Sequence, residues 1–186
     1  MTAIAHKPHV WTRPEYEQLV GSGGLGPESR VELVDGEILD MASQESRHAT
    51  GFRLTEDAVR IAFGGGFDVR PQLPLAIDGF SEPEPDITVV TGGPRDYRDA
   101  HPTTAVPVVE VADSSLEFDR TRKLALYARN GVPDYWILNL VDSMLELHRE
   151  PAGERYAMCI KLAPSEQVTP LHAHNAQPIM VADLLP

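Results

Sequence analysis

The sequence predicts a mixed α/β protein in which helices flank a β-sheet. Two segments, residues 45–63 and 117–130, carry apolar side chains at helical spacing. Short runs rich in valine and isoleucine lie between and after them, which is typical of buried strands. The resulting order of hairpin, helix, strands, helix and strands lacks a regular βαβ repeat. A length of 186 residues suits one domain over residues 1–186.

The first 41 residues predict a helix followed by a hairpin. In "TRPEYEQLV", Thr12 and Glu15 have the spacing of a capping box, and glycines from position 21 onward end the helix. In "RVELVDGEILDM", Asp35-Gly36 is a favoured two-residue turn. We therefore expect strands over residues 31–34 and 37–41.

The next helix is expected over residues 45–63, where three consecutive glycines end it. Its apolar face consists of His48, Phe52, Thr55, Val59 and Phe63. Two strands follow, "FDVRPQLPLAI" (67–77) and "DITVV" (86–90), separated by the proline-rich turn "FSEPEP". A further strand, "VPVVEVA" (106–112), has apolar residues on both faces, which predicts a central position in the sheet.

The last third of the chain predicts a helix and then a run of strands. The helix covers residues 117–130 and ends at Gly131, with Pro133 beyond it. We expect strands at 134–140, 144–150 and 155–163, and a tail over 176–186 that closes with a strand and a short turn. The aromatic residues of this region are interpreted as core: Tyr127, Tyr135 and Trp136.

Composition limits the possible functions. The net charge is −12, and an acidic protein is a poor candidate for non-specific binding to phosphate backbones unless a basic patch or divalent cations intervene. The single cysteine, Cys159, excludes an internal disulfide framework, and we expect a buried free thiol. No apolar run suits a signal peptide or a membrane span, so a cytoplasmic protein without membrane partners is expected.

Two carboxylates stand where strands are expected to be apolar. Asp86 begins the strand in "PEPDITVV", and Glu110 lies inside "VPVVEVADSS". Because a buried charge is costly unless it is paired or bound to metal, the two could meet across adjacent strands and hold a magnesium ion. Alternatively, Asp86 only ends the turn after Pro85, and Glu110 faces solvent at a sheet edge.

Lysine is scarce, with Lys7, Lys123 and Lys161 as the three examples. Lys123 lies in the first turns of the predicted helix that follows the Glu110 strand, on one face with Asp119 and Tyr127. Its side chain could reach the strand ends. The alternative is a solvated lysine paired with Asp119, which contributes little to stability.

Three stretches together resemble one known family. They are "PEPDITVV", "VVEVADSSLEFDRTRKLALYARNGVPDYWIL", and "VELVDGEI" with His48. They are similar to the Uma-type (Uma-two) restriction-endonuclease family, formerly a domain of unknown function, within the PD-(D/E)XK nuclease superfamily. The resemblance covers about residues 12–148 and is strongest over 86–136. It implies a restriction-endonuclease-like core and a metal-dependent endonuclease that hydrolyses phosphodiester bonds of DNA.

The resemblance also implies roles for individual residues. Asp86 and Glu110 would bind Mg²⁺ (or Mn²⁺), with the backbone carbonyl of Val111 as a third ligand. The superfamily's lysine normally stands where this chain has Ala112, and in Uma-type proteins it has moved to the following helix, which makes Lys123 the catalytic lysine. The positions with supporting roles are Glu32, His48, Gln72 and Asp119. Homodimers are expected, because the superfamily often cuts both strands with two sites.

The substrate-binding surface is defined only by arginines. Arg120 and Arg122 lie beside Lys123, and Arg95 and Arg98 fall between the two key strands. These side chains could flank a phosphate-binding cleft, although arginine runs are usually solvated surface. No helix-turn-helix or zinc finger is visible.

Two other interpretations remain open. In "LHAHN", His172 and His174 have a spacing that is found in metal-binding β-barrels, although two convincing helices argue against a barrel. The second alternative is a catalytically silent nuclease fold that serves as a binding or dimerisation module, which the charge of −12 would suit.

Overall fold

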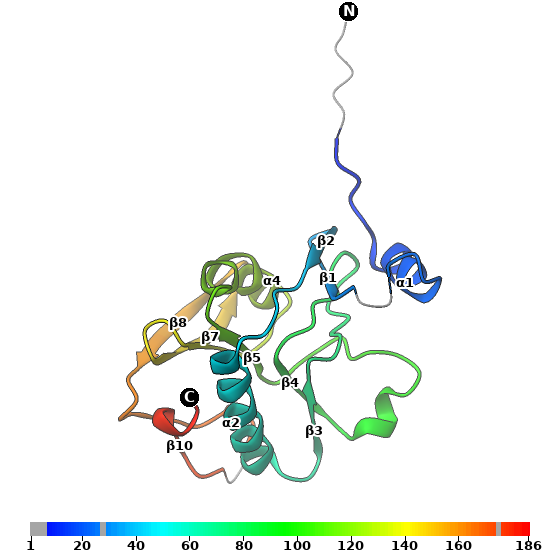
Figure 1. The fold of residues 1–186 in the computed structure, drawn as a ribbon. Coiled ribbons are helices and arrows are strands. Elements are labelled where there is room, and N and C mark those ends of the chain that lie inside the picture. The colour runs from blue at the N-terminus through cyan, green and yellow to red at the C-terminus, as the bar shows by residue number, and fades with distance from the viewer. Residues whose placement is uncertain (1–6, 27–28, 174–175) are drawn as a thin grey trace, which may run out of the picture.

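The centre of the molecule is a six-stranded mixed sheet with the strand order β3-β4-β5-β6-β7-β8 (Figure 1). A computed structural model describes residues 7–26, 29–173 and 176–186. The strands are β3 (Phe67–Pro71), β4 (Ile87–Thr91), β5 (Val108–Ala112), β6 (Asp134–Asn139), β7 (Met144–Ala152) and β8 (Arg155–Leu162). β5 and β6 are parallel, and the other neighbours are antiparallel. The predicted central position of the Glu110 strand is confirmed.

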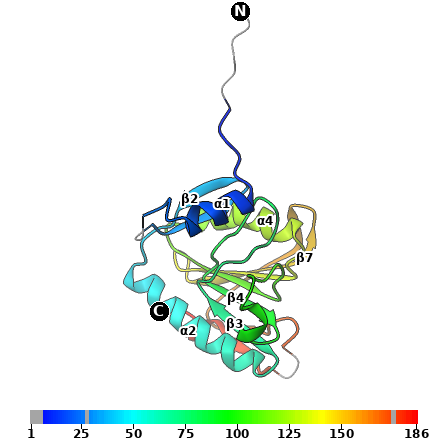
Figure 2. The same cartoon turned by 90° about the vertical axis from the view of Figure 1, so that its right-hand side faces the viewer.

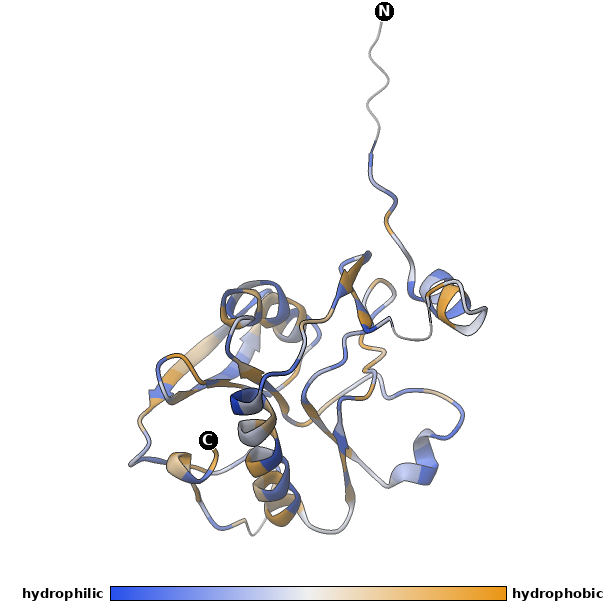
Figure 3. Ribbon diagram, viewed as in Figure 1, coloured by the Kyte–Doolittle hydropathy of each residue, from blue (hydrophilic) through white to orange (hydrophobic). Residues whose placement is uncertain are grey.

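Helices cover both faces of this sheet. α2 (Ser46–Phe63) packs Val59 and Phe63 onto one face, together with Val109 and Val111 of β5. On the other face, α4 (Leu124–Arg129) packs against Val108 and Ala112, whose side chains point away from α2. Figure 2 shows α2 and α4 on opposite sides of the strands, and Figure 3 shows hydrophobic residues along the strands of the sheet. The two apolar layers enclose β5 from both sides.

The N-terminal elements confirm the predicted helix and hairpin. α1 (Arg13–Gly21) begins after Thr12, whose backbone N–H donates to the Glu15 carboxylate at 2.9 Å. β1 (Val31–Val34) and β2 (Glu37–Asp40) pair antiparallel as a separate two-stranded sheet. Asp35 and Gly36 both have positive φ, 54° and 77°, as a tight two-residue hairpin turn requires.

Two elements differ from their predicted form. The strand expected over 67–77 stops at Pro71, because Gln72 takes a left-handed backbone conformation (φ 48°) and its N–H donates to the carbonyl of Asp86. The helix expected over 117–130 consists of three consecutive segments: α3 (Leu116–Phe118), a π-helical segment η2 (Asp119–Lys123) and α4. Wide π turns are uncommon and occur frequently at functional sites. This one carries Asp119 and Lys123.

The C-terminal part follows the prediction in outline. Short strands β9 (Gln167–Val168) and β10 (Ile179–Met180) pair antiparallel, and the 3₁₀ turn η3 (Val181–Asp183) follows. Another 3₁₀ turn, η1 (Pro94–Tyr97), lies between β4 and β5. Of the two histidines of "LHAHN", His172 is described and His174 lies outside the described residues. None of the described helices combines the length and apolar character that a bilayer crossing needs.

The predicted burial of aromatic residues is confirmed, and that of the cysteine is wrong. Tyr127, Tyr135 and Trp136 are fully buried. Cys159 is exposed, because it lies on β8, the last strand of the sheet, where most side chains face solvent.

Candidate metal and catalytic site

The candidate site lies where β4 and β5 separate. Their pairing consists of Ile87 with Val109 and Thr88 with Val108, so β5 continues beyond the start of β4. Asp86 immediately precedes β4, and its backbone N–H lies 3.4 Å from the carboxylate of Glu110. The main chain of Asp86 therefore contacts the Glu110 carboxylate across neighbouring strands, and both residues line the same cavity. Glu110 is 4% exposed on a central strand, so the alternative that it faces solvent at an edge is wrong.

Three donors from different elements hold the Asp86 carboxylate. Its Oδ2 accepts from the backbone N–H of Val111 at 2.8 Å and lies 3.2 Å from His48 Nε2. Its Oδ1 accepts from Gln72 Nε2 at 3.2 Å. Burial acts to raise the pKa of Asp86, but the hydrogen bonds with His48 and Val111 outweigh it and hold the pKa below the usual value. Asp86 is therefore ionised at neutral pH.

His48 reaches the site from the first turn of α2. Its contact with Asp86 raises the pKa of the imidazole against the opposing effect of burial. The other ring nitrogen, Nδ1, is buried without a hydrogen-bond partner among the described residues. His48 thus contacts the site through Asp86, and its supporting role stays a prediction.

The Glu110 carboxylate contacts two side chains from the face of the sheet that α4 covers. Its Oε1 accepts from Tyr127 Oη at 2.8 Å and from Lys123 Nζ at 3.1 Å. Burial raises the pKa of Glu110 to about 8, and the positive charge of Lys123 opposes that rise. The carboxylate is therefore much more easily protonated than an exposed glutamate.

Lys123 lies inside the site and not on the surface. Its side chain is 7% exposed, and Nζ lies 3.3 Å from Glu32 Oε2 in addition to its contact with Glu110. Burial lowers the pKa of Lys123, but the carboxylates of Glu110, Glu32 and Asp119 raise it above the ordinary value. The alternative of a solvated lysine is wrong, because this ammonium is buried and joins the Glu110 strand to the hairpin.

Asp119 and Ala112 complete the surroundings of the lysine. Asp119 Oδ2 accepts from the Ser115 hydroxyl at 2.6 Å, and burial raises the pKa of Asp119 to about 6. Ala112 is fully buried and packs in the apolar cluster that contains Leu126. The position two residues after Glu110 is therefore apolar, and the ammonium group comes from η2.

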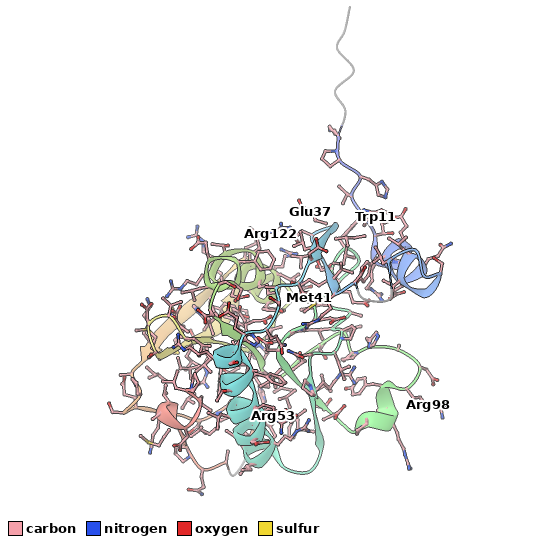
Figure 4. The ribbon with its side chains drawn as sticks, in the orientation of Figure 1. Trp11, Glu37, Met41, Arg53, Arg98 and Arg122 are labelled. Carbon is pink, nitrogen blue, oxygen red and sulfur yellow. The ribbon has the colours of Figure 1, made fainter. Side chains whose placement is uncertain are left out.

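The site residues line one cavity of about 260 Å³. The predicted residues in its wall are Glu32, His48, Gln72, Asp86, Glu110, Asp119 and Lys123. Further lining residues are Arg30, Glu84, Ser115 and Phe118, together with residues 39 and 40 of β2 and residues 41, 42 and 44 after the hairpin. Figure 4 shows Met41 on the chain between the hairpin and α2. Acidic side chains outnumber basic ones in this wall, so the cavity favours cations.

The donor chemistry of the cavity fits a hard divalent cation. Mg²⁺ takes one or two carboxylates and fills its other positions with waters and substrate phosphate, which Asp86 and Glu110 would allow. The described residues contain no group of three or more His, Cys, Asp or Glu arranged as a complete metal site. The N–H of Val111 points to Asp86. In an extended strand the carbonyl of a residue points to the same side as its N–H, so the Val111 carbonyl lies on the β4 side of β5, although Val111 is not among the residues that line the cavity.

The four arginines proposed to contact substrate do not line this cavity. Arg120 pairs with Glu146, and Arg122 pairs with Glu37 of the hairpin. Arg95 is exposed in η1, and Arg98 pairs with the adjacent Asp99. Figure 4 shows Arg122 close to Glu37, and Arg98 at the opposite edge of the view, beside η1. The basic residues in the cavity wall are Arg30, His48 and Lys123.

Sequence reasoning missed several residues of the site, among them Tyr127, Ser115 and Glu84. Tyr127 was interpreted as core, but its hydroxyl reaches Glu110. Ser115 bonds Asp119, and Glu84 lines the cavity, where burial raises the pKa of its carboxyl group. The helical spacing of four residues between Lys123 and Tyr127 was a usable signal for the tyrosine. The glutamate in a proline-rich turn gave none.

Comparison with known proteins identifies similar sequences and folds. The model of a family described as "Uma2: Putative restriction endonuclease" matches residues 13–178. No match was found among curated proteins. A crystal structure from Anabaena variabilis, described as a "putative nuclease belonging to DUF820", is similar with a TM-score of 0.71 over 93% of this chain and 96% of that chain. At 13% sequence identity this similarity concerns the fold alone.

Proposed function

The chain belongs to the Uma2 family, whose description reads "Putative restriction endonuclease", and from this membership we propose that it is a metal-dependent endonuclease acting on phosphodiester bonds of DNA. The predicted fold class, a restriction-endonuclease-like mixed sheet flanked by helices with an N-terminal helix and hairpin, agrees with the similar nuclease fold. The proposal goes further than the family in naming the cation, the substrate and the residues.

One observation carries the proposal. Two carboxylates, Asp86 just before β4 and Glu110 on β5, line one cavity of about 260 Å³ together with a buried ammonium group, Lys123 Nζ, 3.1 Å from Glu110. Burying these charges is costly. A site that binds a cation and a phosphate explains why they are gathered in a cavity and are not replaced by apolar side chains.

Each residue of the site would have its own role in phosphodiester hydrolysis. A bound Mg²⁺ or Mn²⁺ would polarise the scissile phosphate and lower the pKa of the attacking water. Asp86 and Glu110 would hold it, with the Val111 carbonyl as a further ligand. Lys123 would offset negative charge that builds up on the phosphate, and Glu32 holds the ammonium group from the hairpin side.

Supporting residues would keep the first carboxylate ionised and fixed. His48 and Gln72 both contact Asp86, and the Val111 N–H bonds the same oxygen as His48. Such partners of metal ligands orient them and raise their affinity. Asp119, bonded to Ser115, would add to the negative potential around Lys123. We further propose a homodimer, because nucleases of this superfamily often cut both strands of a duplex with two sites.

A second candidate function is a catalytically silent binding or dimerisation module. The observation that favours it is charge: the chain carries a net charge of −12, and acidic side chains outnumber basic ones in the cavity wall. Without a bound cation, such a surface repels phosphate backbones.

The test is cleavage of supercoiled plasmid and single-stranded DNA with Mg²⁺ or Mn²⁺. We expect nicking that needs the metal and disappears in Asp86→Ala, while Glu154→Ala, at an exposed turn between β7 and β8, leaves it unchanged. Cleavage that survives in Asp86→Ala would refute the assigned site. If the wild-type protein binds DNA but does not cut it under any of these conditions, the binding module becomes the better description.

A further inference from the structure

The two oxygens of the Glu110 carboxylate are held unequally. Oε1 accepts from both Tyr127 Oη at 2.8 Å and Lys123 Nζ at 3.1 Å. Oε2 has one long contact, 3.4 Å from the backbone N of Asp86. A carboxylate oxygen has two lone pairs, so Oε1 is saturated, whereas Oε2 retains the capacity to bind a further partner.

Asp86 shows the same asymmetry. Its Oδ2 is engaged by the Val111 N–H and by His48, whereas Oδ1 accepts from Gln72 at 3.2 Å. Each carboxylate thus has one oxygen saturated by protein donors and one oxygen with spare capacity. Protein donors therefore determine which oxygen of each pair is available.

The tyrosine that donates to Glu110 is itself packed in the core. Tyr127 is fully buried on α4, and its ring lies 4.9 Å from that of Tyr135, centroid to centroid. Burial raises the pKa of the Tyr127 phenol well above its usual value, so the hydroxyl keeps its proton and remains a donor. Lys123, by contrast, divides its ammonium group between Glu110 and Glu32.

We propose that Tyr127 is a positioning residue: by bonding Oε1 it fixes the Glu110 carboxylate so that Oε2 is presented to the divalent cation. This inference rests on the proposed function, because it assigns a task to Tyr127 only if Glu110 binds a metal. Tyr127 touches neither the cation nor the substrate. It acts through Glu110, as hydrogen-bonding partners of metal ligands do elsewhere.

Tyr127→Phe removes the hydroxyl and keeps the ring. Without the bond to Oε1, Glu110 is held by the shared lysine and can rotate away from the orientation that binds the cation. Loss of such a partner typically weakens metal affinity by about 10- to 100-fold, and we expect a change near the lower end because Lys123 remains. Saturating Mn²⁺ should restore the maximal rate of cleavage, because the catalytic groups themselves are intact.

Tyr135→Phe is the matched control. Tyr135 is also fully buried, and its hydroxyl also donates a hydrogen bond, but the acceptor is the backbone carbonyl of Asp119, at 3.0 Å. Both variants lose one buried hydrogen bond and should lose similar stability, about 1 kcal/mol. A general loosening of the aromatic layer would affect them alike, whereas the proposed role would not.

The experiment is a titration of wild type and both variants with Mn²⁺ at pH 8.5, followed by calorimetry or by the free-ion EPR signal. We expect an about tenfold weaker Kd in Tyr127→Phe and a change below about twofold in Tyr135→Phe. Equal affinities of wild type and Tyr127→Phe, or equal losses in the two variants, would overturn the proposal.

Two further results separate this proposal from the proposed function. Wild-type protein that binds no Mn²⁺, or binds it equally after Asp86→Ala, would refute the metal site and the task of Tyr127 together. A metal site that depends on Asp86 but not on Tyr127 would refute only the latter. If Tyr127→Phe does not fold, Tyr127→Met, which also keeps apolar bulk without a donor, replaces it in the same comparison.

Discussion

Lys123 Nζ lies 3.1 Å from Glu110 Oε1, although the two residues are 13 positions apart and belong to different elements. The lysine comes from the π-helical segment η2, and the glutamate from β5. Position 112, on the same face of β5 as Glu110, is occupied by a buried alanine. The ammonium group thus reaches the carboxylate from the helix that packs above the strand, which leaves the strand itself apolar beyond Glu110.

If the position of the ammonium group in space matters, and not the residue that carries it, a lysine at position 112 should partly replace Lys123. Lys123→Met should reduce cleavage by about 100- to 1000-fold, as does the loss of other groups that stabilise transition-state charge. Adding Ala112→Lys to Lys123→Met should recover part of that rate, because residues 110 and 112 of a strand point to the same face. Cleavage rates per folded molecule are the measurement.

The control for the relocation is Ala112→Met with Lys123→Met, which has similar bulk and no charge. Overpacking at the buried Ala112 should cost both double variants about 1–3 kcal/mol, so their stabilities are comparable. Equal residual rates in the two double variants would show that the lysine cannot act from the strand and that its path from η2 is essential.

The buried carboxyl group of Glu82 should make the stability of the fold depend on pH. It is 5% exposed, and its Oε2 is buried without a partner among the described side chains. Burial, reinforced by the nearby Glu17, raises the pKa of Glu82 to about 7. Because the folded-state pKa is raised, the associated stability is present below the unfolded pKa of about 4.5 and is lost as the pH rises through about 7.

Glu82→Gln should remove this dependence. Relative to wild type, we expect little change in the free energy of unfolding at pH 5 and a gain on the order of 2–3 kcal/mol at pH 8, where the wild-type carboxylate is buried as an anion. Urea unfolding at both pH values measures it, with the exposed Glu154→Gln as control. A gain of the same size at both pH values would mean that Glu82 does not change its ionisation in this range.

A substitution of Arg120 tests whether this arginine stabilises the fold or contacts the substrate, as the sequence had suggested. It pairs with Glu146, a buried carboxylate that also accepts from Asn139 at 2.8 Å. Arg120→Gln should therefore lower the free energy of unfolding by about 1–3 kcal/mol. It should leave the affinity for DNA and its salt dependence unchanged, as measured by fluorescence anisotropy at several salt concentrations. A salt slope reduced by about one would instead identify a phosphate contact.

Local sequence patterns predicted most elements and the proximity of Asp86 to Glu110 across neighbouring strands. Alternation and turn residues define a strand and its faces, and an acidic residue inside such a strand is conspicuous because its burial is costly. The π turn at Asp119–Lys123 could not be predicted, since its residues also suit an ordinary helix. The Tyr127 hydroxyl and the arginine partners depend on contacts between distant segments, which spacing along one element does not encode.

Cation binding should weaken as the pH falls through about 8. The pKa of Asp86 is lowered, so its charge is constant across the neutral range, whereas the pKa of Glu110 is raised to about 8 by burial. A metal ligand must be deprotonated, so below this pKa each proton on Glu110 competes with the cation. We expect the Kd for Mn²⁺ to rise about tenfold per pH unit between pH 7.5 and 6 and to level off above pH 8.5. In Glu110→Gln the affinity should be low at every pH. A wild-type Kd that is constant from pH 6 to 9 would mean that Lys123 keeps Glu110 ionised despite its burial, and that the pair is already charged before any metal binds.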